Sequence, residues 1–146
     1  MNVKTTCVLT AFLTAFLMAT NTFAATAPAK TKPVSVDVSS SFLIDEATSE
    51  KIWNDNLPAR VKKLYPVKRW RFVSDIGGGF TESKTCVITA RAMLLPMRGK
   101  DVIFDPEKSA TTFDAVPNLS KEQCQELARA KLKEAIQAVT ASIAAP

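Results

Sequence analysis

An amphipathic stripe near the C-terminus constrains this chain more than any other feature. From Ser120 to about Ile143, apolar residues recur every three or four positions, as on one face of an α-helix, and charged residues lie opposite. Ser120 and Gln123 have the spacing of a capping box, and Leu119 before the cap can pack on Cys124 as a hydrophobic staple. The pattern predicts a core-facing helix with Cys124 in its first turn. The apolar positions are Cys124, Leu127, Ala128, Leu132, Ala135, Ile136, Val139 and Ile143.

Residues 1–24 have the three parts of a secretory signal peptide. Lys4 supplies the positive charge, an apolar run extends from Cys7 to Met18, and Ala24 closes the segment. The run of about twelve residues is too short to cross a hydrocarbon core of roughly 30 Å as a helix. We therefore predict cleavage after Ala24 in preference to a retained membrane anchor. The mature chain is then expected to be periplasmic or secreted, without stable membrane insertion.

The remaining sequence predicts one small domain after a lead-in. Residues 25–33 are Ala, Thr, Lys and Pro without periodicity, which indicates a flexible segment. Residues 34–146 suffice for a single domain with one modest core. Removal of Lys4 leaves 18 basic against 14 acidic residues, a net charge of +4. This excess is typical of a solvated surface and lacks the concentrated basic run of a nucleic-acid-binding arm, so we expect no nucleic-acid partner.

Two cysteines remain once Cys7 leaves with the signal peptide. In an exported domain, Cys86 and Cys124 most simply pair with each other. Residues 84–94 alternate as a strand that places Cys86 on its apolar face, so both sulfurs are expected in one core. A reactive thiol pair would have Cys-x-x-Cys spacing, and a zinc site would need more ligands than two cysteines without any histidine. The sequence therefore predicts a disulfide, with no metal and no cofactor.

The apolar residues that precede the C-terminal helix recur with helical spacing in one segment and with strand spacing in others, which predicts the α+β class. Residues 34–38 alternate as a short edge strand, and from Asp45 the pattern turns helical, with Pro58 either kinking this helix or opening a second one. Its expected apolar face contains Trp53, Leu57, Val61, Leu64 and Tyr65.

Strand patterns follow this helical segment. Residues 69–76 and 84–94 alternate as a hairpin, with the strand broken at Gly77-Gly78-Gly79. A third strand is expected at 101–104, and 111–113 is either a fourth strand or an extension. These patterns predict a small antiparallel sheet of three to four strands, with an N-terminal helical segment and a long C-terminal helix packed on one face.

The sequence contains no motif for catalysis. Histidine, the commonest general acid or base, is absent, and carboxylate pairs such as Asp101 with Asp105 lie at strand ends, where solvated acids are common. The glycine run lacks the Lys-Ser/Thr ending of a nucleotide-binding loop. We therefore expect a protein that is not an enzyme.

One polar surface is predicted by the pleat of the strands. The face opposite the apolar one would present Arg69, Arg71, Thr89 and Arg91, whose guanidinium groups could pair with carboxylates or phosphates. Whether the arginines meet depends on the strand register, and an ordinary solvated face is the alternative.

Two functions remain open from the sequence. The first is an exported, non-enzymatic binding protein, such as an inhibitor, an immunity-type protein or an accessory subunit, that recognises an anionic protein or envelope component. The second is a small hydrolase or ligand carrier with a pocket between the helices and the sheet, near Trp53, Tyr65 and Trp70. Nothing in the sequence indicates the oligomeric state.

Overall fold

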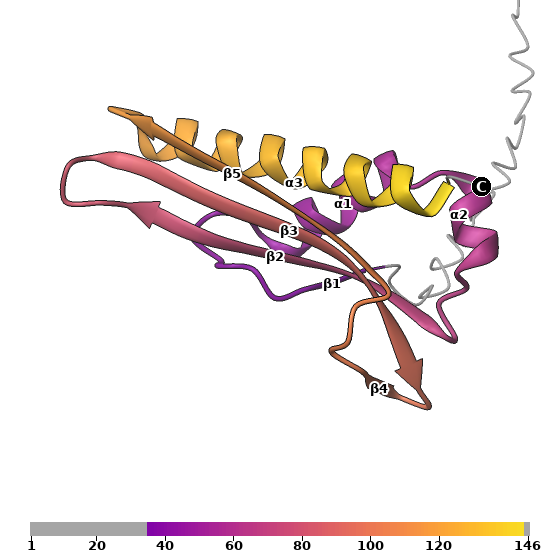
Figure 1. The fold of residues 1–146 in the computed structure, drawn as a ribbon. Coiled ribbons are helices and arrows are strands. Elements are labelled where there is room, and N and C mark those ends of the chain that lie inside the picture. The colour runs from indigo at the N-terminus through magenta and orange to yellow at the C-terminus, as the bar shows by residue number, and fades with distance from the viewer. Residues whose placement is uncertain (1–34, 145–146) are drawn as a thin grey trace, which may run out of the picture. The chain divides into compact units, whose positions relative to one another are not determined.

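The computed structural model describes residues 35–144 as a five-stranded sheet and three helices (Figure 1). The predicted signal peptide, the lead-in at 25–33 and strand residue Val34 lie outside the described residues. The elements are β1 (Ser35–Asp37), α1 (Glu46–Asn56), α2 (Ala59–Leu64), β2 (Trp70–Phe80), β3 (Thr85–Arg98), β4 (Asp101–Val102), β5 (Lys108–Pro117) and α3 (Lys121–Ala144).

The sheet confirms the α+β class but is mixed. β2 and β3 form a long antiparallel hairpin, β5 pairs antiparallel with the other side of β3, and β4 pairs with the end of β3. β1 pairs with β2 in parallel. The reason is the connection, because α1 and α2 lie between these strands and form the crossover that a parallel pair requires. The expectation of an all-antiparallel sheet of three to four strands was therefore wrong in this detail.

The glycine run lies inside a strand. We expected Gly77 to Gly79 to break the strand, but β2 continues to Phe80, which pairs with Cys86. The turn of the hairpin follows at residues 81–84. Gly78 has φ +130°, and a Cβ built on it would lie 2.0 Å from the carbonyl oxygen of Val87. Glycine here allows β2 and β3 to approach closely, so the glycines serve the pairing rather than the turn.

The N-terminal helical segment forms two helices. Asp45 caps α1 by accepting a hydrogen bond from the Thr48 backbone N–H at 2.8 Å, and the hydrogen bonds from Thr48 lower the pKa of this carboxyl. Pro58 precedes α2 as its N-cap, which confirms the second of the two outcomes that its position allowed. Trp53, Leu57 and Val61 are buried, whereas Leu64 is 52% exposed and does not belong to the expected apolar face.

The main core lies between the helices and one face of the sheet. The predicted stripe of α3 is buried from Cys124 to Ile143, except that Leu127 is only partly buried at its margin. Trp53 packs on Phe72 with ring centroids 5.2 Å apart. The facing residues of β3, which belong to the same core, are Cys86, Ile88, Ala90, Ala92 and Leu94.

A disulfide joins the first turn of α3 to the central strand. Cys86 and Cys124 have Cα atoms 5.8 Å apart, and both residues are fully buried. This is the pairing that the sequence predicts.

The predicted capping box is present at the start of α3. Ser120 N–H donates to Gln123 Oε1 at 2.8 Å, and Gln123 N–H donates to Ser120 Oγ at 3.2 Å. Two backbone donors that the helix cannot satisfy internally are thereby satisfied.

We expect Ser120→Ala to lower the free energy of unfolding by about 1 kcal/mol, because Gln123 N–H loses its acceptor. Urea unfolding followed by far-UV circular dichroism measures the change. Gln137→Ala, which alters an exposed residue of α3 far from the box, is the control. Equal effects of the two substitutions would show that the box contributes nothing.

Candidate functional site

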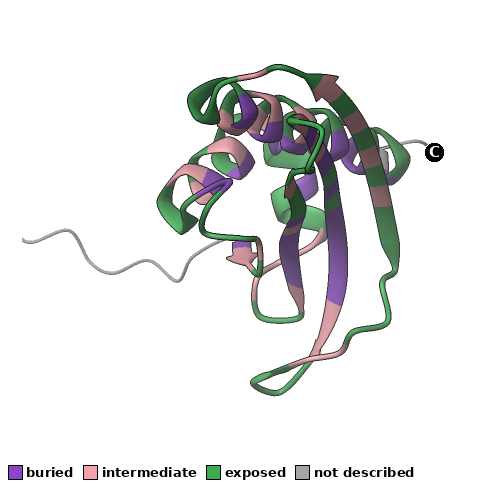
Figure 2. Cartoon of the chain, turned by 90° about the vertical axis from the view of Figure 1, so that its left-hand side faces the viewer, coloured by how far each residue is buried: buried purple, intermediate pink, exposed green. Residues whose placement is uncertain are grey.

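The second face of the sheet is divided into a covered half and an open half. Odd-numbered residues of β3 lie on this face, because the even-numbered ones belong to the main core. In the covered half, Val73, Met93 and Leu95 are buried and pack with Val36 and Val102. Figure 2 shows the contrast along the sheet, where the buried stretches of β2 and β3 adjoin a β5 with no fully buried residue.

The open half presents a cation, two hydroxyls and an aromatic ring. We call it the Arg91 face, and it consists of Thr89, Arg91, Thr111 and Phe113. Register pairs Thr89 with Phe113 and Arg91 with Thr111, so the four form two adjacent cross-strand pairs. All four are exposed, and Phe113 is 62% exposed.

Asp75 adjoins the Arg91 face from the other side. It is the register partner of Arg91 on β2, while the register partner of Thr89 is Gly77, which has no side chain. No ion pair within the described residues joins Arg91 to Asp75. The Arg91 guanidinium is thus exposed among short side chains and accessible to an external acceptor.

The other two predicted arginines lie elsewhere. Arg71 is only 5% exposed, and its guanidinium donates to the Val67 carbonyl at 2.8 Å. Asp75, which is opposite Arg91, lies four residues further along β2, so Arg71 and Arg91 are roughly 13 Å apart along the strands. Arg69 precedes β2 and is exposed. The structure therefore brings Thr89 and Arg91 together and separates them from Arg69 and Arg71.

Phe113 and Thr111 were not among the residues predicted for a site. The sequence suggested a strand at 111–113 but did not fix its length, and the side on which Phe113 lies follows only from its pairing with β3. Apolar and polar residues do not alternate over 108–117, so the sequence alone provides no signal that Phe113 would lie on the exposed side of this strand.

A separate cleft of about 490 Å³ lies between α1 and α3. Two ion pairs line it, Lys51 with Asp55 and Arg129 with Glu126. Arg129 Nε is buried without a hydrogen-bond partner. The residues lining the cleft are Thr48, Lys51, Ile52, Asp55, Asn56, Glu126, Arg129, Ala130 and Lys133.

The aromatic residues expected near a pocket belong to the core. Trp53 is fully buried, and its indole N–H points to Ser74 Oγ at 3.4 Å. Ser74 Oγ is also hydrogen-bonded to Ser49 Oγ at 2.6 Å. Tyr65 packs edge-on against Trp70 at the margin of the same core. These contacts give each ring a packing role.

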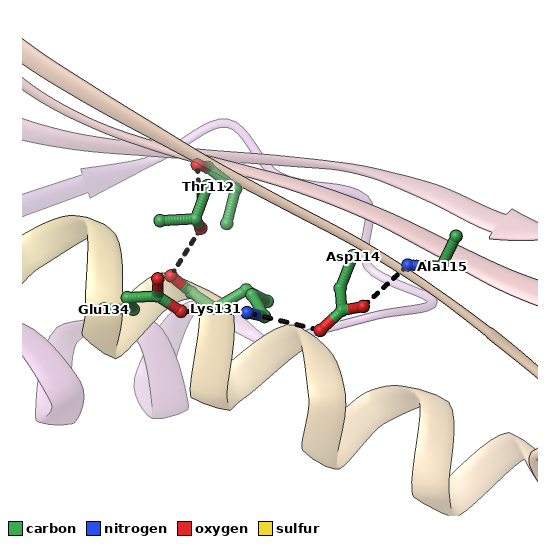
Figure 3. A network of polar contacts seen from close by, with 6 residues as sticks. Thr112, Asp114, Ala115, Lys131 and Glu134 are labelled. Carbon is green, nitrogen blue, oxygen red and sulfur yellow. Dashed lines mark hydrogen bonds and ion pairs between the residues drawn. The ribbon is translucent and has the colours of Figure 1, made fainter.

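A polar network holds β5 against α3 (Figure 3). Thr112 donates to the Lys131 carbonyl at 2.9 Å, and Lys131 Nζ lies 3.2 Å from Asp114 Oδ2 and 2.9 Å from Glu134. Both carboxylates raise the pKa of Lys131. The network fixes β5, and with it Thr111 and Phe113, on a rigid support.

Neither a metal-binding cluster nor a membrane-spanning helix occurs within the described residues. No group of three or more His, Cys, Asp and Glu in this part of the chain could hold a metal ion. No helix between residues 35 and 144 is long and apolar enough to cross a membrane. Comparison of the chain with protein families, with curated proteins and with solved structures finds no match.

Proposed function

We propose that this chain is a small, exported, non-enzymatic binding protein that recognises an anionic protein or envelope component through the Arg91 face. The observation that carries the proposal is the exposed Phe113 beside Arg91, which forms no ion pair with any residue between 35 and 144. Phenylalanine and arginine are both enriched in protein interfaces relative to the rest of the protein surface. A carboxylate or phosphate of the partner would accept from Arg91 while an apolar group covers Phe113.

Rigidity and redox chemistry support this proposal. β3 and β5 are anchored to α3 by the Cys86–Cys124 pair and by the Thr112–Lys131 contact, so little conformational entropy is lost when the face is covered. A cysteine pair at disulfide distance suits an oxidising compartment, such as the periplasm or the extracellular space. The absence of histidine agrees with recognition rather than acid–base catalysis.

The cleft between α1 and α3 favours a second candidate function, a carrier of a small ligand. Its size is within the usual range of roughly 300–1,000 Å³ for ligand pockets. Its lining is charged, and the ion pairs already satisfy most of that charge. The Arg91 face has an exposed aromatic ring beside a cation that is unpaired within the described part of the chain, so it is the preferred site.

The proposal is tested by immobilising the purified chain and capturing its partner from the exported protein fraction of the source organism. We expect one stoichiometric partner, bound at least about tenfold more weakly by Arg91→Glu, because the reversal places like charges together. Phe113→Ala should weaken the same complex. Calorimetric titration with the purified partner gives both values.

Arg60→Glu provides the matched control. Arg60 is an exposed arginine of α2, so the substitution changes the net charge equally without touching the Arg91 face. Equal binding by the wild type, Arg91→Glu and Phe113→Ala would refute the proposal. Stronger loss with a substitution in the cleft, such as Arg129→Gln, would favour the carrier function instead.

A further inference from the structure

β5 is a long strand with an open outer edge. It pairs with β3 over ten residues, and no other described strand pairs with its far side. Such an edge presents unpaired backbone N–H and C=O groups and is a template for another strand. From Ala110 to Pro117, residues of β5 alternate between half-buried and exposed, and Lys108 and Ser109 are both exposed (Figure 2).

The hydrogen bonds of the sheet identify which groups of β5 face outward. The carbonyls of Ser74 and Ile76 accept hydrogen bonds from the backbone N–H groups of Val38 and Ser40. The backbone N–H and C=O groups of even-numbered β2 residues therefore point toward β1, and those of odd-numbered residues point toward β3. The registers carry this alternation across the sheet. The backbone groups of even-numbered β5 residues therefore bond to β3, and the backbone groups of odd-numbered residues point to the open edge. The latter are Ser109, Thr111, Phe113 and Ala115.

Two features limit the usable length of this edge. Ala115 N–H donates to Asp114 Oδ1 at 2.9 Å, so it is not available to a partner. Pro117, the next outward position, has no N–H. The outward backbone N–H groups that no described residue bonds are those of Ser109, Thr111 and Phe113, which are evenly spaced about Thr111.

A second copy of the chain complements this arrangement. If two β5 strands pair antiparallel about a two-fold axis at Thr111, Ser109 faces Phe113 of the other copy and Thr111 faces Thr111. Each of these outward N–H groups then meets an outward carbonyl, and capped Ala115 lies outside the ladder. On the α3 side of the sheet, the same register places Lys108 opposite Asp114 of the other copy, where it would join the existing ion pair between Asp114 and Lys131. Opposite charges in direct cross-strand pairs are favourable, and symmetry makes two such pairs.

We propose that this chain forms a symmetric homodimer by antiparallel pairing of β5 with β5 about Thr111. The dimer joins the two sheets into one and places two Arg91 faces on the same surface. This inference does not rest on the proposed function, because it uses the backbone of β5 and the Lys108–Asp114 pair rather than the Arg91 guanidinium.

Cysteine cross-linking tests the register directly, in a Cys7→Ser background that retains Cys86 and Cys124. Facing residues of a hydrogen-bonded pair have Cα atoms about 5.5 Å apart, which a disulfide can span. Thr111→Cys is therefore expected to give a covalent dimer on mild oxidation. Phe113→Cys is the matched control, because its two copies would be offset by roughly 13 Å along the strands. A non-reducing gel separates the products.

Sedimentation of the chain without added cysteines tests the charge pair. We expect a concentration-dependent shift toward twice the monomer mass, and a roughly tenfold weaker dimer for Lys108→Glu, which places like charges opposite each other twice. Lys100→Glu makes the same change in net charge away from β5 and should leave the dimer intact.

Three outcomes would overturn the proposal. A monomer at all concentrations, with no Thr111→Cys cross-link in a variant that folds normally, excludes the dimer. A cross-link through Phe113→Cys but not Thr111→Cys means a different pairing. A monomer in which the Ser109, Thr111 and Phe113 amides are nevertheless protected from hydrogen exchange means that another segment covers the edge.

Discussion

Replacing both Cys86 and Cys124 with alanine is expected to lower the free energy of unfolding by about 4 kcal/mol. The bond links positions 38 apart in the sequence, so it removes much of the loop-closure entropy of the unfolded chain. This loss is a large fraction of the roughly 5–15 kcal/mol that stabilises a typical domain. Urea unfolding of the two proteins at matched pH measures it.

Reduction should reproduce this effect. The wild type unfolded in the presence of dithiothreitol is expected to match the double variant, while the double variant should not respond to the reductant. A difference below about 1 kcal/mol between oxidised wild type and the double variant would contradict a stabilising role for the bond.

Gly78→Ala should destabilise the fold by about 3 kcal/mol or more, because two costs coincide at one residue. Its φ of +130° is strained for any residue with a side chain, and the new Cβ would lie 2.0 Å from Val87 O. That oxygen belongs to the backbone of the central strand, so relief requires β2 and β3 to separate. Thermal and urea unfolding both report the change.

Gly77→Ala is the control for this prediction. A Cβ at Gly77 meets nothing within 4 Å, and its φ lies outside the positive range that strains L-residues. Its substitution should leave stability unchanged or raise it by about 0.5 kcal/mol, because alanine has less freedom than glycine in the unfolded chain. Similar losses for Gly77→Ala and Gly78→Ala would show that the close approach to Val87 is unimportant.

The sequence predicts the elements best where one face is buried throughout. The stripe of α3, its capping box and the partner of Cys86 could all be inferred, because period and cap chemistry are local properties. The parallel pairing of β1 could not, because it depends on the path of α1 and α2. The glycine run was misread since a turn and a close strand pairing both favour glycine, and only the pairing with Val87 distinguishes them.

The candidate site depends on register, which alternation alone does not encode. Arg71 and Arg91 each lie on the polar side of an alternating strand pattern in the sequence. In the structure, Arg71 is buried against the Val67 carbonyl and Arg91 is exposed. Phe113 gained its place beside Thr89 only through the pairing of β5 with β3. A pattern of period two predicts which residues share a face, but not which strands are neighbours or which part of a face is covered.

The order of the elements has a consequence for biosynthesis. Because α3 follows the β2–β3 hairpin in the sequence, the hairpin is synthesised first, and its apolar face, with Ile88 and Leu94 at its centre, stays uncovered until α3 has also emerged from the ribosome. A fragment that stops before Lys121 would keep this face exposed, and we expect it to aggregate rather than form a smaller domain.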